Sequence, residues 1–356
     1  MKTYDVIVIG SGPSGLMCTS QINNKKVLLL EKNPTIGGKI KVSGGGRCNV
    51  TNNKPIEGIM ENIPGNAKFL YPALNTFNSK NIIDFFESNG CQLKEEDNNR
   101  MFPISNSSQS IIDTFSSVLD NKNITIRTDY TVNNIELVNN NYIVNDMFSA
   151  PSIVLATGGT TYPHLGTTGD GYKLLSNLGH TITELTPTET PLVSNDEIIQ
   201  NKTFQGITLK QVTVEMLINN KAKKKMTGDL LFTHFGISGP LGLHLSYYCQ
   251  KALKNKKQVS LKIKLSGEIP KKIKTYTEED FLIININDTK GWKIAFVTAG
   301  GLSLKEVNPK NFESKLHPNL FVIGELLDIN AHTGGYNLTS CMSEGYSVAQ
   351  HINNML

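Results

Sequence analysis

The sequence opens with Tyr4–Ile9 (YDVIVI), followed directly by Gly10–Gly15 (GSGPSG) and then by Leu16–Gln21. The first stretch is short, apolar and β-branched, which predicts a buried strand, and the third can continue as a helix. A second apolar run, Val27–Leu30 (VLLL), ends at Glu31. Strand, glycine turn, helix, strand and acid in this order are typical of the βαβ unit that binds a dinucleotide.

The small residues of the glycine turn have separate physical roles. Gly10 permits the sharp exit from the strand, Gly12 lets the backbone approach a pyrophosphate, and Gly15 lets the helix pack closely on the sheet. The amides at the helix N-terminus favour the negative charge of that pyrophosphate. Glu31 is expected to accept hydrogen bonds from an adenosine ribose, and its charge disfavours a 2′-phosphate there. The candidate contacts in this unit are Gly10, Gly12, Pro13, Ser14, Gly15 and Glu31.

Length and composition place the chain among soluble proteins of two domains. With 356 residues it can bury a large core, and 38% hydrophobic and 19% charged residues are ordinary values. No stretch is long and apolar enough for a membrane span, and no signal peptide precedes the first strand. The five cysteines form neither a CxxC pair nor a Cys/His cluster, so we expect no metal site and no disulfide framework. A reducing cytoplasm is the expected compartment.

The net charge of +4 neither requires nor excludes an acidic partner. Lysines gather in Lys221–Lys225, Lys254–Lys257 and Lys271–Lys274, each near a predicted turn. Because no aromatic residues interleave with them, we interpret these clusters as solvated loop tips rather than as a nucleic-acid surface. The sequence therefore carries no strong nucleic-acid signal, and it leaves the oligomeric state open.

A glycine-rich stretch, residues 32–53, follows the first acid. Its runs Gly37–Lys39 and Ser43–Asn49 hold too many glycines for a helix or a central strand, so we expect an extended loop. Basic and amide side chains in these runs suit a loop wrapped around an anionic cofactor. The candidate contacts here are Lys32, Gly38, Lys39, Gly46, Arg47, Cys48 and Asn49. Cys48 beside a flavin admits a redox-sensing role, against the alternative of a buried structural thiol.

A meander of strands is expected beyond a mainly helical region at residues 54–120. Thr131–Val138 and Tyr142–Val144 pair across an asparagine turn, an arrangement that often accompanies the parallel sheet of a flavin domain. Val132 is then a candidate backbone contact to adenine. A further apolar strand, Ser152–Ala156, ends in small residues that let backbone approach a cofactor. The candidates there are Ala156, Thr157 and Gly158.

The pattern changes near residue 187. The following segment alternates polar and apolar residues with period two, as in Gln211–Leu217 and Val259–Leu265. We therefore expect a β-rich insert over residues 187–296, the candidate substrate domain. It interrupts a discontinuous cofactor domain made of residues 1–186 and 297–356. Within the insert, Ser238 is expected to cap a helix.

The C-terminal part again combines a strand, an acidic residue and glycines that open a helix. Leu320–Ile323 (LFVI) is a strand, an acidic residue follows it, and Gly334–Leu338 opens a helix. In FAD proteins such an acid binds ribityl or ribose hydroxyls, and such a helix N-terminus faces the N1–C2=O edge of the flavin. NAD has no such distant end, so FAD is favoured over NAD. The candidates are Gly324, Glu325, Asp328, Gly335, Tyr336, Asn337 and Leu338.

Catalytic residues are not identified by the sequence. The candidates to face a substrate are His164, His234, His332 and Tyr336. Histidine has a pKa suited to proton transfer, but a loop histidine can equally be solvated or bonded to backbone.

Several long motifs together resemble the BaiN-type (YhiN-like) family of FAD-dependent oxidoreductases. They are Ser43–Asn52, Arg100–Pro103, Ala156–Tyr172, Thr233–Pro240, Phe296–Gly301 and Gly324–Leu338, and they span nearly the whole chain in one order. The resemblance implies an α/β fold: a glutathione-reductase-like Rossmann FAD-binding domain interrupted by an antiparallel β-barrel-like insert. It also implies an activity such as reduction of unsaturated bile-acid intermediates or aminoacetone oxidation. The family's insert usually carries a sizeable helical segment, whereas Ser266–Glu279 is short, which implies a more open site or a different substrate.

Three functions follow as hypotheses. In the first, FAD carries a hydride from NAD(P)H to an unsaturated or carbonyl small molecule, and the absence of a second GxGxxG makes the nicotinamide a transient co-substrate. In the second, FAD oxidises an amine or alcohol and O₂ reoxidises it. In the third, a flavin-bound protein without turnover associates with RNA or senses redox state. NAD(P)H consumption against peroxide release separates the first two.

Overall fold

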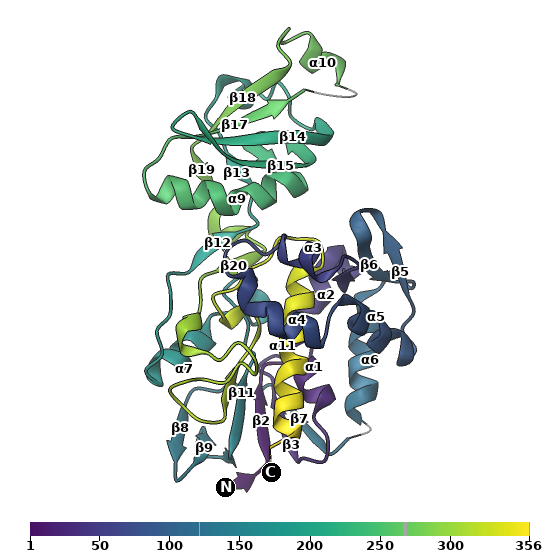
Figure 1. Cartoon of the computed structure of the whole chain (residues 1–356), viewed down its shortest axis with the longest axis vertical. Helices are drawn as coiled ribbons and strands as arrows, with labels where there is room; N and C mark the ends of the chain where they lie inside the picture. Colours follow the sequence, from purple (N-terminus) through teal and green to yellow (C-terminus); the bar gives the residue numbers. More distant parts are fainter. Residues whose placement is uncertain (121, 266–268, 356) are drawn as a thin grey trace. The chain divides into compact units, whose positions relative to one another are not determined.

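The computed structural model describes residues 1–120, 122–265 and 269–355 of the chain. They form two compact units: unit 1 is Met1–Leu185 with Thr298–Leu356, and unit 2 is Thr186–Val297 (Figure 1). Each boundary lies one residue from the expected position. The chain passes between the units at β12 (Thr186–Thr188) and β20 (Val297–Ala299).

Unit 1 is built on a parallel sheet of five strands in the order β21-β11-β2-β3-β7. The strands are β2 (Val6–Ile9), β3 (Val27–Leu30), β7 (Ile124–Arg127), β11 (Ser152–Leu155) and β21 (Leu320–Val322). Except for the edge strand β7, every residue of these strands is buried. Burial on both faces explains why the strands are continuous apolar runs. Strands from both ends of the sequence thus lie in one sheet.

Helices α1 (Pro13–Gln21) and α11 (Tyr336–Asn353) lie side by side next to this sheet (Figure 1). Their close approach depends on Gly345, where an added Cβ would lie 2.4 Å from the carbonyl oxygen of Ser14. Any larger side chain would force the two helices apart. The other helices of unit 1 are α2 (Gly38–Val42), α3 (Ile56–Met60), α4 (Tyr71–Thr76), α5 (Ser79–Ser88), α6 (Ser108–Asp120) and α7 (Asp170–Asn177).

Two smaller sheets complete unit 1. One has the order β1-β10-β9-β8, and the other is antiparallel with the order β4-β6-β5. Their strands are β1 (Lys2–Thr3), β4 (Thr51–Asn52), β5 (Leu93–Glu96), β6 (Arg100–Pro103), β8 (Ile135–Val138), β9 (Asn141–Val144) and β10 (Phe148–Ala150). The strand expected from Thr131 begins only at Ile135. The backbone amides of Asn133 and Asn134 donate instead to Oδ1 of Asn145, which turns this stretch away from strand pairing.

The expectation of one extended loop over residues 32–53 is wrong. The stretch contains helix α2 and the 3₁₀ turn η1 (Ser43–Gly46). Glycine is used at the junctions: Gly37 precedes α2 with φ +72°, and Gly44 and Gly45 take φ +56° and +69°. These left-handed conformations reverse the chain between short helical turns, at little steric cost for glycine.

Unit 2 contains an antiparallel sheet of seven strands in the order β18-β17-β14-β15-β16-β13-β19. The strands are β13 (Leu192–Val193), β14 (Thr208–Ile218), β15 (Lys221–Phe232), β16 (Gly236–Ser238), β17 (Val259–Lys264), β18 (Phe281–Ile286) and β19 (Asp288–Thr289). The two end strands are joined through Asn287, whose amide donates to the carbonyl of Val193. The insert is therefore built on an antiparallel sheet, as expected, and its barrel-like closure stays a prediction.

Helix α9 (Gly239–Lys254) covers one face of this sheet and closes a second apolar core. Ser238 precedes it, but its side chain makes no capping hydrogen bond, so that expectation is wrong. The shorter helices are α8 (Glu197–Gln200) and α10 (Lys271–Lys274). Of the segment expected to be short, Ser266–Glu279, residues 266–268 lie outside the described part of the chain.

Only one of the three lysine clusters follows the loop interpretation. In Lys254–Lys257, Lys254 ends α9 and the other lysines lie beyond the helix, whereas Lys271–Lys274 is helix α10. Lys221–Lys225 is the first part of β15, because the preceding turn is completed by Asn219 and Asn220, both with positive φ. None of the helices in the described residues combines the length and apolarity that a bilayer crossing requires.

Candidate cofactor site

The turn from β2 into α1 leaves room for a ligand at one glycine. On Gly10, an added Cβ would lie 2.4 Å from the carbonyl oxygen of Ala156. On Gly15, it would lie 2.0 Å from the carbonyl oxygen of Gly10. At Gly12 the nearest atom would be 4.0 Å away. Gly10 and Gly15 are therefore required by the packing of the protein itself, whereas Gly12 borders open space. Helix α1 starts there without a side-chain cap, so its first amides fit an anionic group.

Glu31 lies at the carboxyl end of β3 and is 8% exposed. Its Oε2 accepts from the amide and hydroxyl of Ser11, at 2.9 and 2.5 Å. Its Oε1 accepts from the amide and Nδ2 of Asn33, both at 2.8 Å. Four internal bonds thus hold the carboxylate in place, and a ribose hydroxyl would join them or displace the Ser11 hydroxyl. The ribose contact of Glu31 stays a prediction.

The start of α11 lies against the segment that contains Asn49. An added Cβ on Gly335 would lie 2.6 Å from the carbonyl of Thr51 and 3.1 Å from Oδ1 of Asn49. Helix α11 also begins without a side-chain cap. This places the second helix N-terminus beside the glycine-rich stretch, as an extended cofactor requires.

Several buried polar atoms in the predicted cofactor segments make no hydrogen bond within the described residues. They are Oδ1 of Asn49, Oδ1 of Asn52, Oγ1 of Thr157 and Nδ2 of Asn330. A buried polar atom left without a partner costs about 1–3 kcal/mol. A cofactor with polar edges would supply those partners, so the residues present fit FAD. Asn52 and Asn330 were not identified as contacts from the sequence, although both lie inside quoted motifs.

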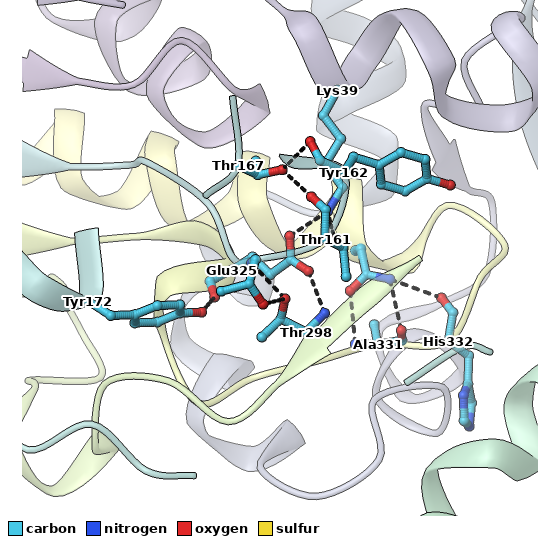
Figure 2. A network of polar contacts seen from close by, with 11 residues as sticks. Lys39, Thr161, Tyr162, Thr167, Tyr172, Thr298, Glu325, Ala331 and His332 are labelled. Carbon is cyan, nitrogen blue, oxygen red and sulfur yellow. Dashed lines mark hydrogen bonds and ion pairs between the residues drawn. The ribbon is translucent and has the colours of Figure 1, made fainter. Parts of the chain in front are cut away.

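An ion pair joins two of the predicted cofactor residues (Figure 2). Nζ of Lys39 lies 2.6 Å from Oε2 of Glu325 and donates to Oγ1 of Thr161 at 3.0 Å. Oε1 of Glu325 accepts from the amide of Thr298 at 2.7 Å, and its carbonyl accepts from the hydroxyl of Tyr172 at 2.9 Å. Three other segments of unit 1 therefore converge on Glu325. Thr298 lies within the quoted motif Phe296–Gly301, but only these contacts show that its backbone amide holds the Glu325 carboxylate.

The other two basic candidates form ion pairs elsewhere. Lys32 pairs with Asp170 at 2.5 Å. Arg47 pairs with Glu96 at 2.8 Å, and its guanidinium lies 4.1 Å from the centre of the Phe102 ring. Of the three basic candidates, Lys39 alone shares an ion pair with another predicted cofactor residue.

The thiol of Cys48 is buried next to this region. Burial raises its pKa to about 12, so it stays protonated at neutral pH. A protonated, buried thiol is unreactive, which favours the structural role over redox sensing.

The candidate catalytic residues are spread over both units. His164 is exposed in the 3₁₀ turn η4 (Pro163–Leu165), beside the ring of Tyr162. His332 and Tyr336 are buried in unit 1 near the start of α11. The side-chain amide of Asn337 holds that loop by exchanging hydrogen bonds with the backbone of Ala331 at 2.9 and 2.8 Å. His234 is exposed in unit 2 and lies against Phe235.

The remaining predicted contacts lie where the fold brings strand ends and helix starts together. Val132 is buried in the irregular segment before β8, and Ala156 follows β11. Gly324, which follows β21, has φ +77°, and an added Cβ would lie 2.6 Å from Oγ of Ser14. The segment after β21 therefore lies directly against the start of α1.

The family model described as HI0933-like protein Rossmann domain matches residues 4–351. The chain belongs to this family. The match confirms the family resemblance carried by the motifs and the Rossmann fold expected from the first stretch. Within this family the protein is an FAD-dependent oxidoreductase.

Curated members of the family cover nearly the same length. The ribosomal RNA dihydrouridine synthase of Escherichia coli (strain K12) is 27% identical over 401 residues, covering 99% of this chain and 98% of the relative. The Haemophilus influenzae protein of the same name is 28% identical over 405 residues, covering 97% and 98%. The 3-dehydro-bile acid delta(4,6)-reductase of Clostridium scindens is 25% identical over 400 residues, covering 95% and 96%.

Solved structures of other proteins have a similar fold. A mutant of the E. coli quinol fumarate reductase subunit FrdA superposes with a TM-score of 0.56 at 15% identity, covering 99% of this chain and 70% of that one. The 3-ketosteroid delta1-dehydrogenase of Sterolibacterium denitrificans gives 0.54 at 11% identity, covering 99% and 100%. At these identities the likeness shows the fold alone.

Proposed function

We propose that the protein reduces a C=C bond conjugated to a carbonyl group, with NAD(P)H as the reductant and FAD as the hydride carrier. The observation that carries this proposal is the chemistry common to the family members that align with nearly the whole chain. Making dihydrouridine saturates the C5=C6 bond of a uracil, which is conjugated to the C4 carbonyl. A delta(4,6)-reductase acting on a 3-dehydro bile acid saturates a bond conjugated to a ketone.

The two substrate classes differ in size and charge. Our first candidate substrate is a uracil base in ribosomal RNA. Two of the curated relatives are named for making dihydrouridine in ribosomal RNA, and unit 2 is strongly basic. The second candidate is an unsaturated small molecule, as the bile-acid reductase acts on. In both, one hydride adds to the carbon distant from the carbonyl and one proton adds to the neighbouring carbon.

The residues of unit 1 would bind and orient the cofactor. When bound, FAD supplies the hydride transfer between nicotinamide and substrate. The start of α1 at Gly12 would hold the pyrophosphate, and Glu31 the adenosine ribose. The start of α11 would stabilise negative charge at the N1–C2=O edge. Glu325, positioned by Lys39, is the proposed partner for the ribityl hydroxyls.

Anaerobic spectroscopy of the holoprotein tests this proposal. NADH or NADPH should bleach the yellow flavin, and ribosomal RNA or a small enone should restore the colour. The product nucleoside, or the saturated ketone made from the enone, should be heavier than its substrate by two hydrogen atoms in mass spectrometry. If only O₂ restores the colour and peroxide accumulates in equal amount, the protein is an oxidase and the proposal is wrong.

A further inference from the structure

The small net charge of the chain hides an uneven distribution between the units. Residues 186–297 contain seventeen lysines, no arginine and ten acidic residues, a net charge of +7. The residues of unit 1 contain eighteen basic and twenty-one acidic side chains, a net charge of −3. Charge asymmetry of this kind is typical of a chain that contacts a polyanion through one domain.

Part of this charge lies on the face of the unit 2 sheet opposite α9. In β17, Leu261 and Ile263 are buried in the core with α9, so the alternating residues Lys262 and Lys264 lie on the other face. The register continues this face across the strands. Glu215 of β14 pairs with Lys225 on one side and with Lys262 on the other.

Apolar side chains accompany these lysines. Lys262 pairs across strands with Ile283, which is 49% exposed, and Lys264 pairs with Phe281. Nζ of Lys262 lies 4.0 Å from the centre of the Phe281 ring. An aromatic ring therefore does interleave with lysines here, at positions outside the three clusters seen in the sequence. Charged and stacking groups on one sheet face are the combination that binds exposed nucleotides.

We propose that this face is an RNA-binding surface, formed by Lys225, Lys262, Lys264, Phe281 and Ile283. The inference rests on the proposed function, because it assigns the contact that would hold ribosomal RNA during reduction of a uracil. Lysines neutralise phosphates as point charges and release counterions, without reading sequence. Phe281 offers a ring face to an unpaired base. One phenylalanine and one isoleucine are too few apolar groups to anchor a protein in a bilayer.

Matched lysine variants of the holoprotein test the surface. The first replaces the three surface lysines (Lys225→Gln, Lys262→Gln and Lys264→Gln). The control makes the same charge change at exposed lysines around the end of α9 (Lys251→Gln, Lys256→Gln and Lys257→Gln). The probe is ribosomal RNA extracted from E. coli, and its affinity is measured by filter binding from low to moderate salt.

The surface variant should bind the RNA at least tenfold more weakly than the control variant. Its slope of log affinity against log salt should fall by about two, since about 0.7 counterions are released per phosphate contact to single-stranded nucleic acid. Phe281→Leu should lower the affinity about fivefold and leave the salt slope unchanged, because it removes stacking but no charge. Turnover of NAD(P)H with a dye acceptor should stay unchanged in all three variants.

Equal losses of RNA affinity in the two lysine variants would overturn the proposed RNA-binding surface, since net charge alone would then explain binding. So would an absence of RNA binding by the unmodified protein, or stronger binding to phosphatidylserine vesicles through the same lysines. Dihydrouridine formation is scored separately. If RNA binds through this face but no uracil is reduced, the proposed function fails while the surface stands.

Discussion

Unit 1 and unit 2 differ in where they hold charged side chains: unit 1 buries carboxylates, whereas unit 2 exposes lysines. In unit 1, carboxylates such as Glu31 and Glu344 are buried and receive hydrogen bonds from fixed backbone amides. In unit 2, the basic side chains stand on an exposed sheet face above an apolar core. The first arrangement depends on the position of single atoms, and the second on a sum of charges. Single substitutions should therefore have large effects in unit 1 and small, additive effects in unit 2.

The largest effect is expected at the glycine turn. Gly15→Ala would place a Cβ 2.0 Å from the Gly10 carbonyl oxygen, so we expect at least a tenfold loss of bound FAD and a lower melting temperature. Gly12→Ala is the matched control, because its Cβ meets only open space in the chain. It should keep the melting temperature of the FAD-free protein and still lose FAD affinity. Normal FAD binding by Gly12→Ala would show that the pyrophosphate does not bind at this turn.

The second-largest effect is expected for Glu31→Arg. It removes an acceptor of four internal hydrogen bonds and puts a cation where a buried carboxylate stood. The purified variant should retain little FAD, as measured from its absorbance spectrum. Glu31→Gln, which keeps one acceptor oxygen, should retain more. Unchanged flavin content in Glu31→Arg would contradict the ribose assignment.

Glu344 should make the stability of unit 1 depend on pH. Burial raises the pKa of this carboxyl to about 7, although the Gly324 amide and the Ser340 hydroxyl donate to it. The folded protein then keeps a proton that the unfolded chain has lost, so stability falls as pH rises from about 4.5 to about 7. The loss reaches up to about 3 kcal/mol above that window.

The variant Glu344→Gln isolates this effect. Glutamine does not titrate and keeps an oxygen for the Gly324 amide, so its melting temperature relative to the unmodified protein should rise between pH 5 and pH 8. A constant difference between the two proteins across that range would show that Glu344 titrates in the ordinary way.

The smallest effect is expected for one lysine of the RNA-binding surface. Lys225→Gln alone should weaken RNA binding two- to threefold and reduce the salt slope by about 0.7, with no change in melting temperature. Filter binding and calorimetry measure these values. A tenfold loss from this single change would mean that unit 2 also depends on one fixed contact.

The buried strands of unit 1 could be predicted because local chemistry and burial agree there. Val6–Ile9 and Val27–Leu30 are apolar throughout since both faces of the sheet are covered. The segment after Glu31 was harder, because glycines permit both an extended loop and the short turns found in α2 and η1. The partners of Glu325 come from three segments that are distant from it in the sequence, and no local pattern identifies such contacts.

From the sequence by itself we predicted the dinucleotide fold, a two-part division and FAD rather than NAD, because glycine spacing and hydrophobic period are local properties of the chain. Only the tertiary structure decided that Glu31 is held by Ser11 and Asn33 and that Lys39 pairs with Glu325. It alone placed Lys225 and Lys262 on the same sheet face, on either side of Glu215. The physical reason is that strand register and crossover connections join residues whose separation along the chain carries no information about their distance in space.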